Sequence, residues 1–150
     1  MAHAYSEDGL IEQTCMDLFR QLGWHTLNAY RGETFGDAGT LGRRSEAEVV
    51  LRRPFYEAIR ALNPGLPAAA YDQAYALISA DSATLTLAEL NHERYHYLRD
   101  GIPVDYKNEK GEIVRNRKMR VFDFGDPAQN HFLAVQQFWV EGKSGRRKRP

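Results

Sequence analysis

Residues 130–140 read Asn-His-Phe-Leu-Ala-Val-Gln-Gln-Phe-Trp-Val and constrain the architecture more than any other segment. Its apolar and aromatic content predicts a buried β-strand. A glycine-containing turn follows at residues 141–145, and residues 146–150 read Arg-Arg-Lys-Arg-Pro. A core strand needs a further strand beside it, because its backbone donors and acceptors are otherwise unpaired. We therefore expect the 150 residues to be the front portion of a fold whose remaining strands follow Pro150.

The length and composition are those of one globular domain. The chain has 150 residues, and 43% of them are hydrophobic, which is enough apolar material for a core. No run approaches the roughly 18 to 20 apolar residues that span a bilayer, and residues 1–8 do not resemble a signal peptide. The cytoplasm is the expected compartment, with no membrane partner. The single cysteine, Cys15, is in an apolar helical stripe and is predicted to be a small core residue.

Charge is balanced in total but uneven along the chain. Twenty basic side chains offset twenty acidic ones. Residues 143–150 carry five basic side chains and no acidic one, and residues 107–120 carry six basic side chains against Glu109 and Glu112. Such clusters are typical of surfaces that follow a phosphate backbone, although solvated turns and tails have the same composition. Both interpretations stay open for both clusters.

Apolar spacing predicts a first helix over about residues 7–22, ended by Gly23. Its expected inward stripe consists of Leu10, Ile11, Thr14, Cys15, Leu18, Phe19 and Leu22. Residues 24–30 are predicted to be a short strand. Residues 31–42 contain four glycines and are predicted to be a loop. That loop has no Gly-Lys-Ser/Thr ending, which argues against a nucleotide cradle.

The middle of the chain is predicted to be helical and the last third to be strands. Ser45 with Glu48 and Thr86 with Glu89 have the spacing of capping boxes, and Pro54 and Pro67 are suited to first helical turns. The expected helices end near residues 62, 78 and 100. Three strands are then expected over residues 102–107, 112–124 and 132–140, as a hairpin plus one further strand.

Two groups of potential metal ligands have simpler explanations. Residues 92–96 read His-Glu-Arg-Tyr-His, which matches the short pattern of zinc proteases, but no third ligand is recognisable. A solvent-facing helix is the favoured interpretation. Asp123 and Asp126 flank a Phe-Gly pair and could bind a cation, yet an aspartate in such a turn commonly accepts hydrogen bonds from neighbouring backbone N–H groups.

Glu12 is the carboxylate of most interest. At 100° per residue it falls roughly 100° from the centre of the predicted apolar stripe, at its rim. A rim acid can lean over a site at the edge of the core. Spacing alone favours the alternative, a solvated helix acid.

Several segments, in one order along nearly the whole chain, resemble the N-terminal region of the R (restriction) subunit of type I restriction-modification enzymes. The segments that carry the resemblance are residues 7–12, 22–24, 62–67, 98–106, 121–124, 130–138 and 146–150. The resemblance implies a nuclease domain of the PD-(D/E)xK kind, in which an Asp and a Glu hold Mg²⁺, a Lys positions the attacking water and a Glu on the first helix supports the site. The family's Asp directly follows the proline matched by Pro150, and its Glu-x-Lys is on the next strand.

Carried over residue by residue, the resemblance assigns only Glu12 to the catalytic set and assigns no metal ligand within the chain. It implies DNA binding by the basic turn, whose cationic residues are Lys143, Arg146, Arg147, Lys148 and Arg149. Such side chains could hold a scissile strand by its phosphates. We therefore expect no DNA cleavage by these residues alone and no cofactor bound to them, with ATP used only by motor domains elsewhere.

The resulting expectation is an α/β chain. Residues 1–150 would form one incomplete restriction-endonuclease-like domain, with a helical insertion over about 45–100, a terminal set of strands over about 102–140 and no second domain. Its expected partners are double-stranded DNA and the modification and specificity subunits of a type I complex. The alternative is a non-enzymatic DNA- or protein-binding module on the same scaffold.

Overall fold

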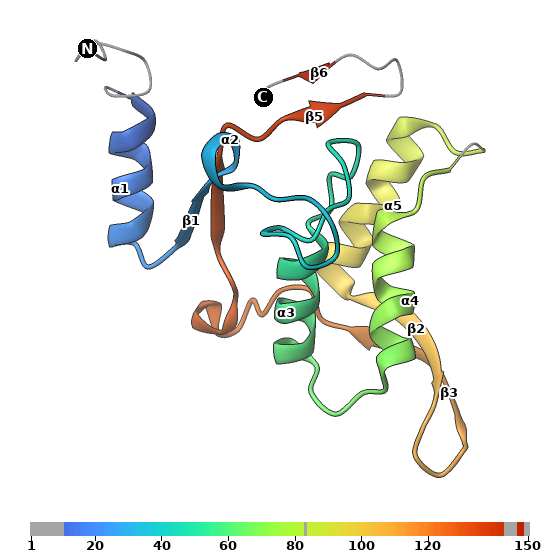
Figure 1. The fold of residues 1–150 in the computed structure, drawn as a ribbon. Helices are drawn as coiled ribbons and strands as arrows, with labels where there is room; N and C mark the ends of the chain where they lie inside the picture. Colours follow the sequence, from blue (N-terminus) through green and yellow to red (C-terminus); the bar gives the residue numbers. More distant parts are fainter. Residues whose placement is uncertain (1–10, 83, 143–146, 149–150) are drawn as a thin grey trace, which may run out of the picture. The chain divides into compact units, whose positions relative to one another are not determined.

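The computed structural model describes residues 11–82, 84–142 and 147–148. The chain divides into two compact units (Figure 1). Unit 1 joins the part up to Val49 to the part from His131 onward, and unit 2 is the intervening segment Val50–Asn130. Each unit is described by itself.

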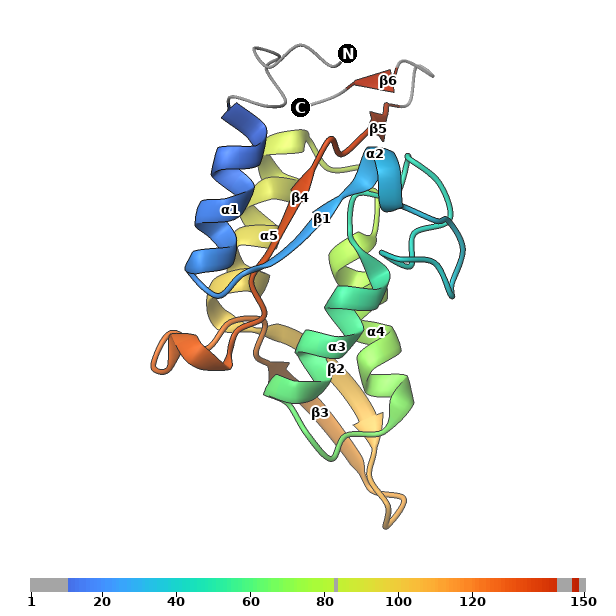
Figure 2. The same ribbon diagram turned by 60° about the vertical axis from the view of Figure 1, so that its left-hand side comes forward.

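Unit 1 is built on two short parallel strands from opposite ends of the chain. Strand β1 (His25–Asn28) pairs with β4 (Leu133–Gln136), from His25 opposite Leu133 to Asn28 opposite Gln136. Helix α1 (Gln13–Gln21) lies beside both strands, and the one-turn helix α2 (Ala29–Gly32) follows β1 (Figure 2). Strands β5 (Val140–Glu141) and β6 (Arg147–Lys148) pair antiparallel. The predicted strand at 132–140 is thus confirmed in part, and its partner is the strand predicted at 24–30.

Aromatic stacking holds α1 against the strands of unit 1. The Trp24 ring is 4.8 Å from Phe19, near the end of α1, and 5.0 Å from Phe132, just before β4. The backbone N–H of Trp24 also donates to the backbone carbonyl of Phe19. These contacts join three segments that are apolar in the sequence.

The first helix exists, but its predicted inward stripe is wrong. Ile11, Leu18 and Leu22 are 60%, 56% and 63% exposed, whereas Met16 is buried. Cys15 is exposed, which corrects its prediction as a core residue. The face that α1 turns to β1 and β4 contains Met16, which was not in the predicted stripe. Of the stripe residues that the structure describes, only Phe19 is half-buried, and the others are exposed.

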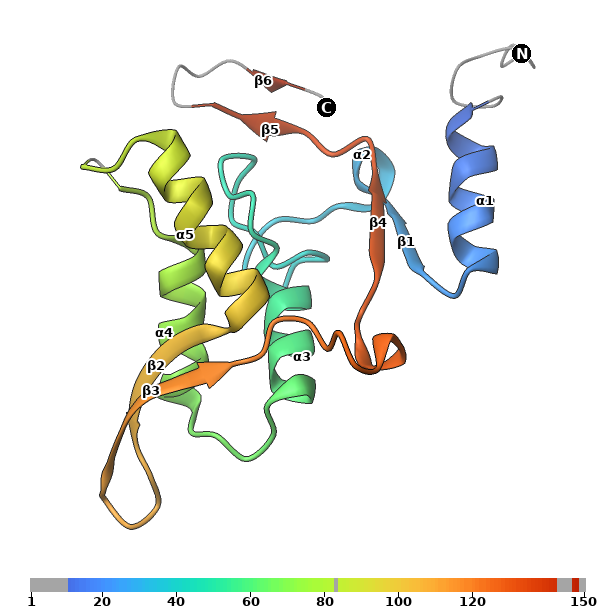
Figure 3. The ribbon, with the colours of Figure 1, turned by 180° about the vertical axis from the view of Figure 1, so that it is seen from behind.

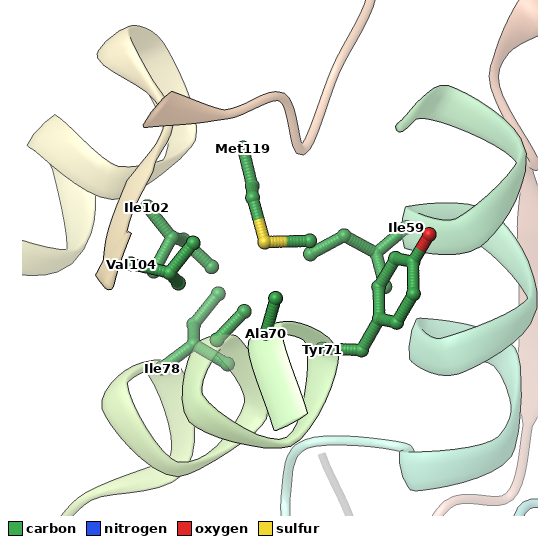
Figure 4. Packing of buried hydrophobic residues seen from close by; sticks show 8 residues of the cluster. Ile59, Ala70, Tyr71, Ile78, Ile102, Val104 and Met119 are labelled. Carbon is green, nitrogen blue, oxygen red and sulfur yellow. The ribbon is translucent and has the colours of Figure 1, made fainter. Parts of the chain in front are cut away.

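Unit 2 packs three helices against a hairpin. The helices are α3 (Arg52–Leu62), α4 (Ala68–Ser79) and α5 (Leu87–Asp100), and the hairpin strands are β2 (Ile102–Lys107) and β3 (Ile113–Met119) (Figure 3). A 3₁₀ turn, η2 (Pro127–Gln129), follows. The apolar core lies between α3, α4 and the hairpin (Figure 4), and its buried members are Ile59, Ala70, Tyr71, Ala74, Ile78, Ile102, Val104 and Met119.

Local signals set most helix limits in unit 2. Thr86 and Glu89 form the predicted capping box, with each side chain accepting from the other residue's backbone N–H. Pro67 immediately precedes α4, as expected. The other predicted capping box does not start a helix, because the Glu48 carboxylate accepts instead from the Arg44 N–H at 2.8 Å and helix α3 begins only at Arg52.

The mixed helices and small sheets agree with the predicted α/β class. The helical part predicted over 45–100 occupies 52–100, but the strands predicted over 102–140 are divided between the units. Strands β2 and β3 belong with the helices of unit 2, whereas β4 belongs to unit 1. The finer expectations, an incomplete endonuclease-like domain and a single domain over 1–150, stay predictions.

Candidate functional site

Glu12 is the centre of a polar cluster at the end of strand β4. One carboxylate oxygen of Glu12, Oε2, accepts from the side-chain amide of Gln136 at 2.6 Å and from that of Gln137 at 2.5 Å. Gln136 is only 8% exposed, and Glu12 is half-buried. Hydrogen bonds to an ionised carboxylate are shorter and stronger than neutral ones. The expectation that spacing favoured, a solvated helix acid, is therefore corrected.

An unusual backbone turn directs two consecutive side chains to the same carboxylate. Consecutive residues of a strand point to opposite faces. Strand β4 ends at Gln136, and Gln137 adopts φ 58°, in the left-handed region that non-glycine residues seldom occupy. The reversal at Gln137 breaks the alternation, so both amides reach Glu12. Such a conformation costs on the order of 1–3 kcal/mol and persists only where its surroundings hold it.

Asn28 extends the cluster to strand β1. Its amide nitrogen donates to Gln136 Oε1 at 3.2 Å, across the register pair in which the two residues face each other. Its amide oxygen accepts from the Arg31 N–H at 3.1 Å, which caps α2. Because Gln136 accepts from Asn28, its amide N–H groups are turned toward Glu12. The donors of the cluster thus converge on the carboxylate.

A buried ion pair supports the neighbouring loop of unit 1. The Arg43 side chain is fully buried and donates to both carboxylate oxygens of Glu33, at 2.5 and 2.6 Å. It also donates to the Trp139 carbonyl at 2.8 Å, and its guanidinium lies 4.0 Å from the centre of the Phe138 ring. This bidentate pair ties the glycine-rich loop to the segment just after β4.

One glycine of this loop is required by close backbone approach. A Cβ atom at Gly39 would lie 2.1 Å from the Thr34 carbonyl oxygen and 2.9 Å from that of Gly36. The loop is closed by reciprocal hydrogen bonds between Thr34 and Thr40. Gly39 therefore allows the loop to fold tightly upon itself.

The predicted DNA-binding tail is described only in part. Lys143, Arg146 and Arg149 fall outside the described residues, as do Glu7, Asp8 and Leu10 of the predicted first helix. Arg147 and Lys148 form β6, opposite Glu141 and Val140 of β5. The role of these five cations in DNA binding stays a prediction.

The two histidines of helix α5 contact each other. Their Nε2 atoms are 3.0 Å apart, and Asp100 Oδ2 is 3.0 Å from His96 Nδ1. No group of three or more His, Cys, Asp or Glu side chains suited to a metal occurs among the described residues. A zinc centre on this helix therefore has no third ligand in that part of the chain.

Asp123 and Asp126 form the predicted turn. Asp123 Oδ1 accepts from the N–H groups of Gly125 and Asp126, both at 3.0 Å, and Asp126 Oδ1 accepts from the Ala128 N–H. The backbone N–H of Asp126 is the main cause that lowers the pKa of Asp123, with Gly125 and Arg120 adding to it. These carboxylates are engaged in shaping the turn.

The described residues do not assemble a Mg²⁺ site. The polar cluster provides one carboxylate, from Glu12, and the amide nitrogens of Gln136 and Gln137 point at it as donors. Mg²⁺ requires oxygen ligands in octahedral geometry.

No helix in the described part of the chain is long and apolar enough to cross a membrane.

Comparison with known proteins identifies the family of this chain. The family model described as the type I restriction enzyme R protein N terminus matches residues 4–150. The chain therefore belongs to that family, as the sequence resemblance predicted. It is 31% identical over 141 residues to the type I restriction enzyme HindI endonuclease subunit of Haemophilus influenzae. This alignment covers 93% of the chain but 13% of that relative, and no solved structure matches.

Sequence reasoning found one member of the cluster and missed three. Glu12 was singled out, whereas Asn28, Gln136 and Gln137 were assigned no role of their own. Asn28 lay in a predicted strand, and the two glutamines lay in a predicted strand that also carries the family resemblance. The sequence did offer one signal for the missed residues, the pair of glutamines inside an otherwise apolar strand. Because buried amides need hydrogen-bond partners, that pair indicates a polar cluster.

Proposed function

We propose that this chain contributes the front part of the nuclease domain of a type I restriction R subunit, which cuts double-stranded DNA within a complex of modification and specificity subunits in the cytoplasm. The observation that carries the proposal is the Glu12 cluster. The carboxylate assigned to the catalytic set by family resemblance is held by two amides at the end of strand β4. Family membership supports the wider role.

In this proposal Glu12 supports the catalytic centre from the first helix. The two short amide contacts keep its carboxylate oriented as an acceptor beside the end of β4. The basic side chains of Lys143, Arg146, Arg147, Lys148 and Arg149 would hold DNA phosphates nearby. Mg²⁺ would be used by the complete nuclease and ATP by motor domains, and no step is assigned to either within this chain.

The proposal makes cleavage depend on residues beyond Pro150. An Asp directly after Pro150 and a Glu-x-Lys on the following strand would complete the catalytic set. Reading the gene past the codon for Pro150 tests this directly. A stop codon there would contradict the nuclease proposal and favour the alternative, a DNA- or protein-binding module.

The role of Glu12 is tested in the complete R subunit assembled with its partner subunits. Glu12→Ala is expected to slow plasmid linearisation by roughly 10- to 100-fold, as for other supporting residues around metal sites, while DNA-stimulated ATP hydrolysis is unchanged. The matched control is Asp17→Asn, which neutralises an exposed carboxylate on the same helix and should cut normally. The 150-residue chain alone with Mg²⁺ should not linearise plasmid. If the chain alone cuts plasmid at a rate that Glu12→Ala does not change, both its expected inactivity and the role of Glu12 are refuted.

A further inference from the structure

The hairpin of unit 2 carries cations that the fold does not use. Five exposed basic side chains lie on β2, β3 and their turn, and we call them the basic hairpin surface: Lys107, Lys110, Arg115, Arg117 and Lys118. None of the five forms an ion pair among the described residues. The sixth cation of this cluster, Arg120, is paired with Asp123 at 2.8 Å.

The hairpin itself engages two of its three acidic side chains, Asp105 and Glu112, whereas Glu109 in the turn is exposed. Glu112 Oε2 accepts from the Asn108 amide at 2.7 Å within the turn. Asp105 Oδ1 accepts from the Asn116 N–H at 2.7 Å across the strands. These contacts hold two carboxylates against hairpin groups, whereas the cations extend into solvent. The asymmetry gives the outer surface of the hairpin a positive character.

A β-bulge brings the arginines of β3 into their positions. Val104 is opposite Arg117 and Tyr106 is opposite Val114, so Arg115 and Asn116 together face the single residue Asp105. Asn116 adopts φ 53°, a left-handed conformation that asparagine tolerates better than most residues. Bulges redirect side chains and increase local twist. Residues 115–118 are consequently all exposed, although neighbouring Met119 is fully buried.

The hairpin is also accessible in shape. Its turn projects past the helices of unit 2 in all three ribbon views (Figures 1–3). A hollow of about 490 Å³ lies between residues 65–67 and the turn residues 106–110, with Lys107 and Lys110 in its lining. A bulky, charged ligand can therefore approach the cations without displacing any element of unit 2.

We propose that the basic hairpin surface binds the phosphate backbone of duplex DNA, at a contact separate from the terminal cations. The choice of DNA as the polyanion rests on the proposed function. Lys107 is four positions along β2 from Pro103, which faces Lys118, and four steps at strand rise span roughly 13 Å. That length corresponds to about four nucleotide steps of one DNA strand. The surface thus accounts for three to five phosphate contacts and makes no sequence-specific one.

The test measures binding of the 150-residue chain to a fluorescent duplex of arbitrary sequence, by anisotropy in EDTA over a range of salt concentrations. The triple variant Arg115→Gln, Arg117→Gln, Lys118→Gln should bind at least about tenfold more weakly at 0.1 M salt, and the slope of log K against log salt should fall in magnitude by about 2 to 3. The loss should be the same for unrelated sequences.

The matched control removes the same net charge from ion-paired surface positions. It is the triple variant Arg20→Gln, Arg44→Gln, Arg53→Gln, whose arginines are all exposed and paired with Asp17, Asp37 and Glu57. This control should bind like the parent chain. Equal weakening by both triple variants would show a mere effect of total charge and would overturn the proposal.

Further readouts guard against misfolding and separate the two proposals. Circular dichroism should be unchanged in the triple variant, and if it is not, the single variants Arg115→Gln and Lys118→Gln replace it. DNA should also protect Lys107, Lys110 and Lys118 of the parent chain from acetylation.

If the triple variant Arg115→Gln, Arg117→Gln, Lys118→Gln binds DNA normally but no longer assembles into the enzyme complex, the surface belongs to an acidic protein partner and our proposal is refuted. Because DNA binding is measured in EDTA, failure of the nuclease proposal appears only in the cleavage assay of the complete subunit.

Discussion

The two units of this protein differ in what they bury. Unit 2 encloses a continuous apolar cluster drawn from consecutive elements of one segment. Unit 1 encloses Arg43 with Glu33 and Gln136 with Glu12, while Ile11, Leu18 and Leu22 of α1 remain exposed. Apolar burial is non-directional, whereas buried polar groups must meet specific partners. Unit 2 therefore has the character of a scaffold, and unit 1 has that of a region organised around a site.

The two tryptophans make this contrast measurable. Trp24 and Trp139 are both in unit 1, and the longest helices, α4 and α5, are in unit 2. Tryptophan fluorescence consequently follows the unfolding of unit 1, while far-ultraviolet circular dichroism is dominated by unit 2.

The largest expected effect is on the buried ion pair of unit 1. Glu33→Ala would leave the fully buried guanidinium of Arg43 without its charge partner, which costs about 3–5 kcal/mol. Urea unfolding followed by tryptophan fluorescence should show this loss. Asp37→Ala is the control, because the pair between Arg44 and Asp37 is more than half exposed on both sides and should contribute less than about 1 kcal/mol. Equal effects of the two variants would remove the distinction between the units.

A core truncation in unit 2 should come next. Ile102 is fully buried opposite Met119, so Ile102→Ala should lower the free energy of unfolding by about 2–5 kcal/mol in the dichroism signal. Ile113→Ala, on the adjoining strand and 59% exposed, should change it by less than about 0.5 kcal/mol. If fluorescence reported the Ile102→Ala loss as strongly as dichroism, the two units would unfold together and the comparison would need to be abandoned.

The cap of helix α5 should give a smaller effect confined to unit 2. Thr86→Ala removes the acceptor for the Glu89 N–H and should cost about 1 kcal/mol by dichroism. Serine at this position preserves the hydroxyl, so Thr86→Ser should retain most of the stability. A loss with Thr86→Ser as large as that with alanine would show that the hydroxyl cap is not the source of the stability.

The same cap predicts the smallest effect, a change in acid sensitivity. Hydrogen bonds from the Thr86 backbone N–H and then its side chain lower the pKa of Glu89. The stabilisation is therefore complete above the ordinary carboxyl pKa of about 4.3 and disappears as pH falls through the lower pKa of the folded state. Glu89→Gln should make the dichroism midpoint less sensitive to pH in that acid range, with neutral-pH helix content retained. An unchanged acid profile would contradict this linkage.

Features set by interactions between residues close in the sequence were predicted correctly, and features set by distant residues were not. The helices of unit 2 were placed well, because Pro67, the Thr86–Glu89 box and the turn after Leu62 act within a few residues. The turn at Asp123 was also predicted correctly for this reason. The face of α1 was not, since Met16 is selected by the strands it meets rather than by its own neighbours.

Only one residue of the polar cluster, Glu12, was predicted from the sequence. Glu12 could be named from family resemblance, but its burial and its partners depend on Gln136 and Gln137, which are more than 120 residues away. The left-handed turn at Gln137 carries no glycine or asparagine that would have revealed it.

The sequence alone was enough for the family, through segments in one order along nearly the whole chain. It was also enough for the α/β composition and most helix boundaries, because caps, turns and apolar periodicity act within a few consecutive residues. Only the tertiary structure decided that β1 and β4 pair in parallel, that Arg43 is buried on Glu33 and that two amides converge on Glu12. Those contacts join segments from distant parts of the chain, and no local pattern specifies which of the possible partners a buried polar group will meet.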